Sequence, residues 1–296
     1  MAKEGKGKAE KVEAKTKKRI SAGKIILIII LLAVAFLLAK KFLFQPPIAK
    51  LLIEQGSVEV KDSIWKTAES GMALKEGQSI RTAAGAKASI IFLDGSAILR
   101  LDESTEITLA KIDKKSISAS QVAGKTWSKI LKVAGLDSYE IETPTAIAAV
   151  RGTAFGIEIT DKTDISVVEG EVLSSSYKIE NGVKKIITSE SLGENKASSI
   201  EKEASVIESR KLEENDWIGE NKLKDEQFIK DKIESLLKKY SLLTGMIKST
   251  QGWSDEQLRQ YATDYVKGKY SFKKLSEEGK IPGILIPLIP EELKRY

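Results

Sequence analysis

The chain has 296 residues, enough for one or two domains with a sizeable core. It contains no cysteine and no histidine, which excludes disulfides, thiol nucleophiles, zinc–thiolate sites and every serine–histidine or cysteine–histidine catalytic arrangement. The whole formal net charge of +6 lies in residues 1–24, which carry nine basic and three acidic side chains. A basic excess confined to a short tail beside an apolar segment indicates membrane topology and lipid contact, and we expect no nucleic-acid partner.

Residues 25–39 form an unbroken apolar run in which twelve of the fifteen side chains are Ile, Leu, Val or Phe. Alone the run spans about 22 Å as a helix, and flanking lysines that reach toward the headgroups extend it. We therefore predict a membrane-spanning helix over residues 25–44, in contact with lipid. The basic tail, residues 1–24, places the N-terminus in the cytoplasm and residues 45–296 in the periplasm or outside the cell.

Two other interpretations of the apolar run stay open. A cleaved signal peptide fits the length of the run, although no small-x-small cleavage site follows it directly. A buried helix of a soluble domain fits the composition, although lysines on both sides favour a bilayer. Because Pro46 and Pro47 follow the run, we expect residues 45–55 to be a short stiff linker.

Residues 56–207 show short alternating apolar segments with turn signals every 8–12 residues, a pattern typical of strands. Asp94 and Gly95 separate two apolar runs, and Asn181 with Gly182 is the clearest hairpin signal in the chain. We predict a mainly β domain here. The pattern does not distinguish a sandwich from a barrel or a solenoid-like roll.

Several ordered landmarks stand within this β-rich part. They are the segments 56–60, 74–82, 92–96, 124–127 and 167–172 and the side chain of Trp65. The most specific is residues 139–155, in which Thr143, Pro144 and Thr145 precede the series Val150, Arg151, Gly152, Thr153. In this order the landmarks resemble the FecR domain family, over about residues 56–200.

The resemblance implies a mostly β domain outside the cytoplasmic membrane, held by a membrane anchor. The best-known members relay the state of an outer-membrane receptor to a cytoplasmic sigma factor in iron uptake. This chain departs from them in its tail of about 24 residues, too short for a folded sigma-binding domain, and in a C-terminal part that has a helical pattern. The fold therefore carries over better than the iron-signalling role.

Arg151 and Thr153 are the candidate ligand-binding residues, as contacts for an anion or another ligand. The structural interpretation of the same stretch is favoured: Arg151 bonds loop carbonyls or a carboxylate such as Asp94, and its neighbours shape a turn and fill the core, namely Pro144, Ile147, Val150 and Gly152.

Other motifs give no catalytic chemistry. Gly124, Lys125 and Thr126 resemble the end of a phosphate-binding loop, but Ala119 stands where that motif requires its first glycine. No carboxylate pair stands out for glycoside hydrolysis. We expect no enzyme activity, no catalytic residue, no metal, no cofactor and no nucleotide.

Residues 208–296 have a helical pattern. An apolar face recurs at Ile229, Ile233, Leu236, Tyr240 and Leu243, with Gly245 as the expected C-terminal stop. A second helix is expected to begin at Ser254, with Gln257 completing a capping box.

The apolar, proline-rich tail at residues 281–290 should not form a helix, because it holds three prolines. We expect it to lie in a groove of its own fold, or, if exposed, to dock on a partner. Together these features predict a non-enzymatic binding or signalling module with an envelope protein as its partner, and alternatively a cell-surface assembly scaffold.

Overall fold

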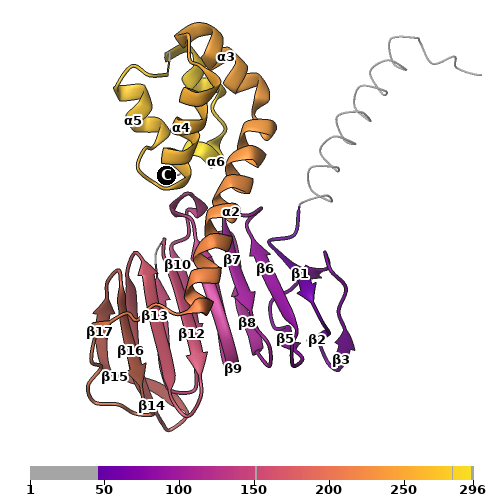
Figure 1. Cartoon of the computed structure of the whole chain (residues 1–296), viewed down its shortest axis with the longest axis vertical. Helices are drawn as coiled ribbons and strands as arrows, with labels where there is room; N and C mark the ends of the chain where they lie inside the picture. The colour runs from indigo at the N-terminus through magenta and orange to yellow at the C-terminus, as the bar shows by residue number, and fades with distance from the viewer. Residues whose placement is uncertain (1–45, 151, 282, 295–296) are drawn as a thin grey trace, which may run out of the picture. The chain divides into compact units, whose positions relative to one another are not determined.

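The computed structural model describes residues 46–150, 152–281 and 283–294 (Figure 1). The described residues from 47 to 294 belong to one compact unit. The predicted membrane helix, residues 25–44, and the basic tail, residues 1–24, lie outside the described residues. Within the part that is described, no helix is both long and apolar enough to cross a bilayer.

The β domain consists of two sheets that share one strand, β9 (Ser116–Ile130). Sheet A has the spatial order β4 (Ala73–Leu74), β1 (Ala49–Gln55), β6 (Lys87–Phe92), β7 (Ala97–Leu101), the second half of β9, β12 (Ala154–Ile159), β13 (Thr163–Glu169), β16 (Lys196–Ile200) and β17 (Arg210–Lys211). Sheet B has the order β3 (Trp65–Thr67), β2 (Val58–Lys61), β5 (Ser79–Thr82), β8 (Glu106–Ile112), the first half of β9, β10 (Ser138–Glu142), β11 (Ala146–Val150), β14 (Val172–Glu180) and β15 (Val183–Leu192). Neighbouring strands are antiparallel except β9 and β10, which are parallel.

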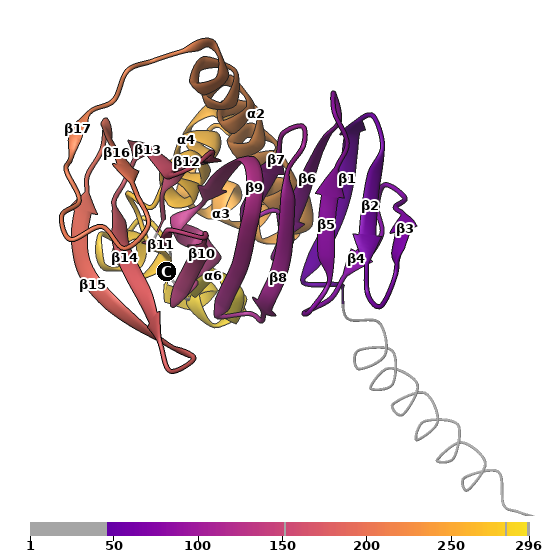
Figure 2. The same ribbon diagram turned by 90° about the horizontal axis from the view of Figure 1, so that it is seen from below.

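The two sheets enclose one hydrophobic core (Figure 2). Leu51, Ile90 and Leu99 of sheet A pack in the same buried cluster as Ile80 and Ile107 of sheet B. The prediction of a mainly β fold followed by helices is therefore confirmed, and the arrangement is a two-sheet sandwich whose sheets meet at a bent strand.

Both predicted hairpin turns are present. Asp94 (φ 54°) and Gly95 (φ 74°) connect β6 to β7, and Asn181 (φ 53°) and Gly182 (φ 76°) connect β14 to β15. Asparagine, aspartate and glycine tolerate this left-handed backbone region best, which is why the turns were visible in the sequence.

The predicted linker at residues 45–55 is wrong, because Ala49–Gln55 is strand β1, paired with β6 and β4. Ala49 and Leu51 are fully buried. The strand has the required alternation, since Ala49, Leu51 and Ile53 fall at every second position and face the core, whereas Leu52 is exposed.

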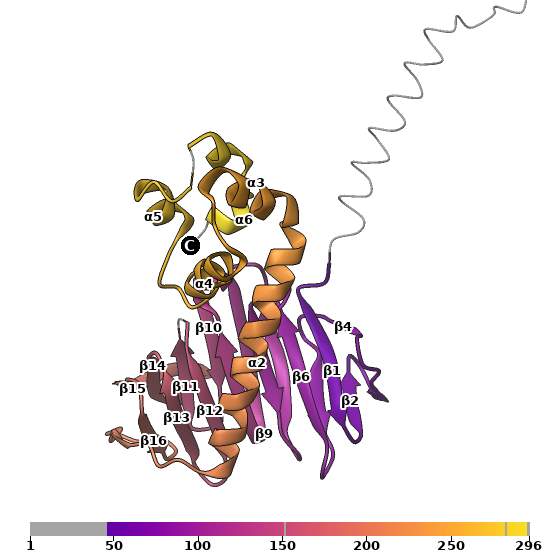
Figure 3. The ribbon, with the colours of Figure 1, turned by 45° about the horizontal axis from the view of Figure 1, so that its top comes forward.

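Helix α2 (Asp216–Lys239) crosses the outer face of sheet A, as Figure 3 shows. The other helical elements are η1 (Lys132–Ala134), α3 (Ser241–Gln251), α4 (Asp255–Val266), α5 (Phe272–Glu277), η2 (Gly283–Leu288) and α6 (Glu291–Lys294). The capping box of Ser254 and Gln257 is confirmed at the start of α4.

The C-terminal stop predicted at Gly245 is wrong, because α3 continues through it and ends at Gly252 in the left-handed conformation (φ 68°). The proline-rich tail was also predicted without a helix, yet η2 contains Pro287. A short 3₁₀ helix needs few backbone hydrogen bonds, so it tolerates a proline that a long α-helix would not.

Burial of the proline-rich tail in its own fold is confirmed for three of its side chains. Ile281, Leu285 and Ile289 lie in a hydrophobic cluster with the apolar faces of α3 and α4. Leu131, at the end of β9, belongs to the same cluster and joins the helices to the β domain.

Tyr139 of β10 reaches across the core, where its hydroxyl lies 2.9 Å from Ser128 Oγ of β9. Full burial raises the pKa of Tyr139 far above its usual value. Between pH 10 and that raised pKa only the unfolded chain releases the phenolic proton, so stability present below pH 10 is lost as pH rises. We expect the wild type to lose about 1.4 kcal/mol per pH unit relative to Tyr139→Phe, measured by urea unfolding above pH 10. Parallel curves for the two chains would contradict this.

Candidate functional site

A buried polar cluster joins sheet A to helix α2. Arg100 of β7 donates from Nη1 to Asp225 Oδ1 of α2 at 2.5 Å. Trp127 of β9 donates from its indole Nε1 to the other oxygen, Oδ2, at 3.0 Å. Both oxygens of the Asp225 carboxylate are therefore satisfied by two different strands, which fixes the position of the helix on the sheet.

The ion pair between Arg100 and Asp225 is almost withdrawn from water, with each side chain 9% exposed. Burial raises the pKa of Asp225, while the charge and the hydrogen bond of Arg100 oppose that rise. A buried pair adds little stability over an apolar pair, but the loss of one partner leaves an uncompensated charge. The pair therefore specifies where α2 docks.

Two tryptophans close the cluster at the start of α2. The rings of Trp127 and Trp217 meet edge to face, with their centroids 5.4 Å apart. Gly156 of β12 permits this contact, because a Cβ atom there would lie 2.5 Å from the Trp217 ring. Lys125 Nζ lies 5.7 Å from the centroid of the same ring, a distance suited to a cation–π interaction.

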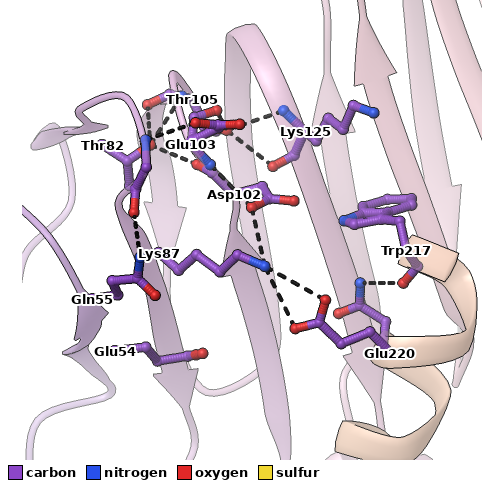
Figure 4. Close-up of polar contacts among 12 residues, drawn as sticks. Glu54, Gln55, Thr82, Lys87, Asp102, Glu103, Thr105, Lys125, Trp217 and Glu220 are labelled. Atoms are coloured by element: carbon purple, nitrogen blue, oxygen red, sulfur yellow. Dashed lines mark hydrogen bonds and ion pairs between the residues drawn. The ribbon is translucent and has the colours of Figure 1, made fainter.

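The rim of the cluster is a network of surface ion pairs (Figure 4). Lys87 of β6 lies between Asp102 and Glu220, with nitrogen–oxygen distances of 3.6 and 3.4 Å. Lys224 contacts Glu220 at 3.0 Å and Glu54 at 3.3 Å. The hydrogen bond from Lys224 lowers the pKa of Glu220, so this carboxyl is ionised at neutral pH.

This cleft is suited to holding a helix. Its free volume is about 20 Å³, the space of a single water molecule. Asp225, whose pKa is raised by burial, is enclosed between Arg100 and Trp127, and the pKa of Glu220 is lowered, so neither carboxyl is suited to act as a general acid on a substrate. Among the described residues, no group of three or more acidic side chains is placed to bind a metal ion.

The two predicted ligand contacts have different outcomes. Arg151 lies outside the described residues, so its role and its pairing with Asp94 stay predictions. Thr153 is fully buried, and its hydroxyl donates to the carbonyl of Glu171 at 3.0 Å. In this conformation a dissolved ligand cannot reach Thr153, and the hydroxyl has a structural contact.

The threonines that flank Pro144 form a hydrogen-bonded turn. Thr143 Oγ1 lies 2.7 Å from Thr163 Oγ1, and Thr145 Oγ1 donates to the carbonyl of Ile200 at 2.9 Å. Both threonine side chains are buried, so this part of the landmark ties β10 and β11 to sheet A.

The prediction that Ile147 and Val150 fill the core is half correct. Val150 is buried, but Ile147 is only partly buried. The two positions are three residues apart, and side chains of a strand alternate between its faces, so both could not point into one core.

A second hollow of about 340 Å³ lies beside the same stretch. Its lining includes Lys115, Lys132, Asp137, Tyr139 and Gly152. Lys115 and Asp137 form an exposed ion pair across its rim at 3.4 Å.

Neither Asp225 nor Arg100 is among the site residues predicted from the sequence. A signal was present: Ile218, Asn221 and Asp225 follow the three-and-four spacing of one helix face, and all three are buried. Because two of them are polar, a search for apolar periodicity finds only the later part of α2.

The comparisons place a known family on part of this fold. Residues 78–173 match the family model described as FecR protein. No curated protein matches the chain. Two crystal structures of a protein from Parabacteroides distasonis ATCC 8503, described as a "putative anti-sigma factor", are each 14% identical with a TM-score of 0.37. The match covers 46% of this chain and 60% of theirs, and a likeness so remote carries no functional argument. Residues 78–173 are thus a FecR-type segment, and the resemblance seen in the sequence is confirmed by the family match.

Proposed function

We propose that this chain is a membrane-anchored, non-enzymatic regulator whose FecR-type domain binds a protein partner in the cell envelope and acts in signalling. The match of residues 78–173 to the FecR family carries the proposal. Residues 25–44 supply the anchor, with residues 1–24 in the cytoplasm.

The geometry of the cleft supports a role in binding. Arg100, Trp127 and Asp225 are used to dock a helix on sheet A, and the surrounding carboxylates are neutralised by lysines. This arrangement builds a rigid surface and offers no reactive group to a substrate.

A second candidate function is a constitutive surface scaffold. A scaffold would bind its envelope partners at fixed stoichiometry, whereas a signalling module would change its partner with a ligand.

Affinity purification of the cross-linked, full-length tagged protein from native membranes, with mass spectrometry, tests the proposal. A chain that lacks residues 2–19 tests the tail. A third chain, with residues 2–19 in scrambled order, keeps the charge that sets topology and removes any sequence-specific recognition.

Signalling across the membrane predicts a cytoplasmic regulator that is lost with both altered tails. Envelope proteins that remain with all three chains would support the scaffold. A chain that does not fractionate with membranes would contradict the anchor itself.

A further inference from the structure

The four outer edges of the two sheets are protected unequally in the described part of the chain. Sheet A ends at β4 and β17, which have two residues each, and sheet B begins at β3, which has three. The remaining edge strand, β15, has ten residues. Natural proteins usually keep edge strands short, because a long one presents unpaired backbone groups to another chain.

Strand β15 pairs with β14 alone among the described strands, and Figure 2 shows it at the margin of the sheet. Its side chains are mostly exposed, including Val183 at 60% and Ile186 at 54%. Leu173 and Ile179 of the neighbouring β14 are also exposed. Val183 and Ile186 lie on opposite faces of the sheet, so an extended strand aligned with β15 would lie beside one apolar side chain on each face.

The charges of β15 favour pairing with a second copy of the same strand in the antiparallel direction. Lys184 and Lys185 lie toward one end, where they pair with Glu142 and Glu180 of their own chain, and Glu190 lies toward the other. An exposed lysine can exchange such a surface pair for a carboxylate of a second copy, because these pairs contribute little stability. In an antiparallel pair of two copies, centred on the strand, Lys185 faces Glu190 of the second copy and Ile186 faces Ser189. A parallel pair would instead oppose equal charges, which is destabilising.

A β-bulge in the strand agrees with the same pairing. The register with β14 shifts between Ser176 and Tyr177, so Ile187 has no partner there. The bulge lies at the middle of β15, where the twofold axis would pass. Residues 183–186 of one copy then face residues 189–192 of the other, and Ile187 faces Thr188 across the axis.

We propose that β15 is a homodimer interface, in which two copies of this chain pair their β15 strands antiparallel and join their B sheets into one continuous sheet. The pairing is isologous, so it closes after two copies. Main-chain hydrogen bonds supply the attraction, and the contacts of Lys185 with Glu190 fix direction and register.

The absence of cysteine makes the interface directly testable in the full chain. In a Lys185→Cys, Glu190→Cys variant the two positions lie about 17 Å apart along one strand, too far for a disulfide within a chain. Across the proposed interface they are directly opposite. Mild oxidation of membranes should give mainly a covalent dimer on a non-reducing gel.

A matched control carries Lys178→Cys with Glu190→Cys. Lys178 lies opposite Lys185 in the same hairpin but on the inner strand β14, about 5 Å farther from a partner. Equal cross-linking of the two variants would overturn the proposal.

Charge reversal gives a second, independent measurement. Lys185→Glu or Glu190→Lys alone should weaken the dimer about 2- to 30-fold, because two contacts are lost in each dimer. The double reversal should restore it. Sedimentation of the full chain in detergent would measure the affinity; a monomer at every concentration, or single reversals without effect, would refute the interface.

Discussion

Replacing Asp225 by alanine is expected to lower the free energy of unfolding by about 3–5 kcal/mol, because Arg100 would keep a buried charge without its partner. The Arg100 side chain is only 9% exposed. The indole N–H of Trp127 would also lose its acceptor. Urea unfolding of a chain of residues 46–296, followed by tryptophan fluorescence, measures the change.

Glu220→Ala is the matched control, since Glu220 lies five residues before Asp225 on the same helix but is half exposed. Surface ion pairs contribute less than about 1 kcal/mol, so this change should be small. Equal losses for Asp225→Ala and Glu220→Ala would contradict the structural role of the buried pair.

A double variant distinguishes the cost of leaving Arg100 without a partner from the cost of disturbing the packing around α2. Arg100→Met combined with Asp225→Leu removes both charges and keeps the volume, so it should recover most of the loss. If the double variant is as unstable as Asp225→Ala alone, packing around the helix matters more than the unpaired arginine.

The parts of the fold that the sequence predicted are those whose pattern is local. The turn at Asn181 and the capping box at Ser254 depend on residues at most three positions apart. The partition of the strands into two sheets was not predictable, because it depends on the bend of β9, where one strand pairs with β8 and β10 and then with β7 and β12.

The polar cluster under α2 could not be predicted from the sequence for a related reason. Arg100 and Asp225 are separated by 125 positions. In the sequence each is one charged residue among many, and only the tertiary structure shows that both side chains are buried against each other. Trp127 was visible as a family landmark, but its hydrogen bond was not.

The bend of β9 leads to the second large expected effect, at Gly124, where the strand passes from sheet B to sheet A. Gly124 has φ 81°, a left-handed conformation that disfavours a side chain. A Cβ atom there would lie 2.5 Å from Thr105 Cα and 2.7 Å from the carbonyl oxygen of Ser104. These backbone atoms cannot move freely, because Thr105 Oγ1 donates to the Lys125 carbonyl at 3.0 Å.

Gly124→Ala should therefore lower the unfolding free energy by about 2–5 kcal/mol, the sum of the left-handed penalty and of overpacking. Gly182→Ala is the control, since Gly182 has a similar φ of 76° but nothing within 4 Å of an added Cβ. It should show the conformational penalty alone, about 1–2 kcal/mol. The difference between the two variants, measured by urea unfolding of residues 46–296, isolates the close approach of Thr105. If Gly124→Ala loses no more than Gly182→Ala, the corner tolerates a side chain, and the conformation of Gly124 alone, without tight packing, accounts for the glycine there.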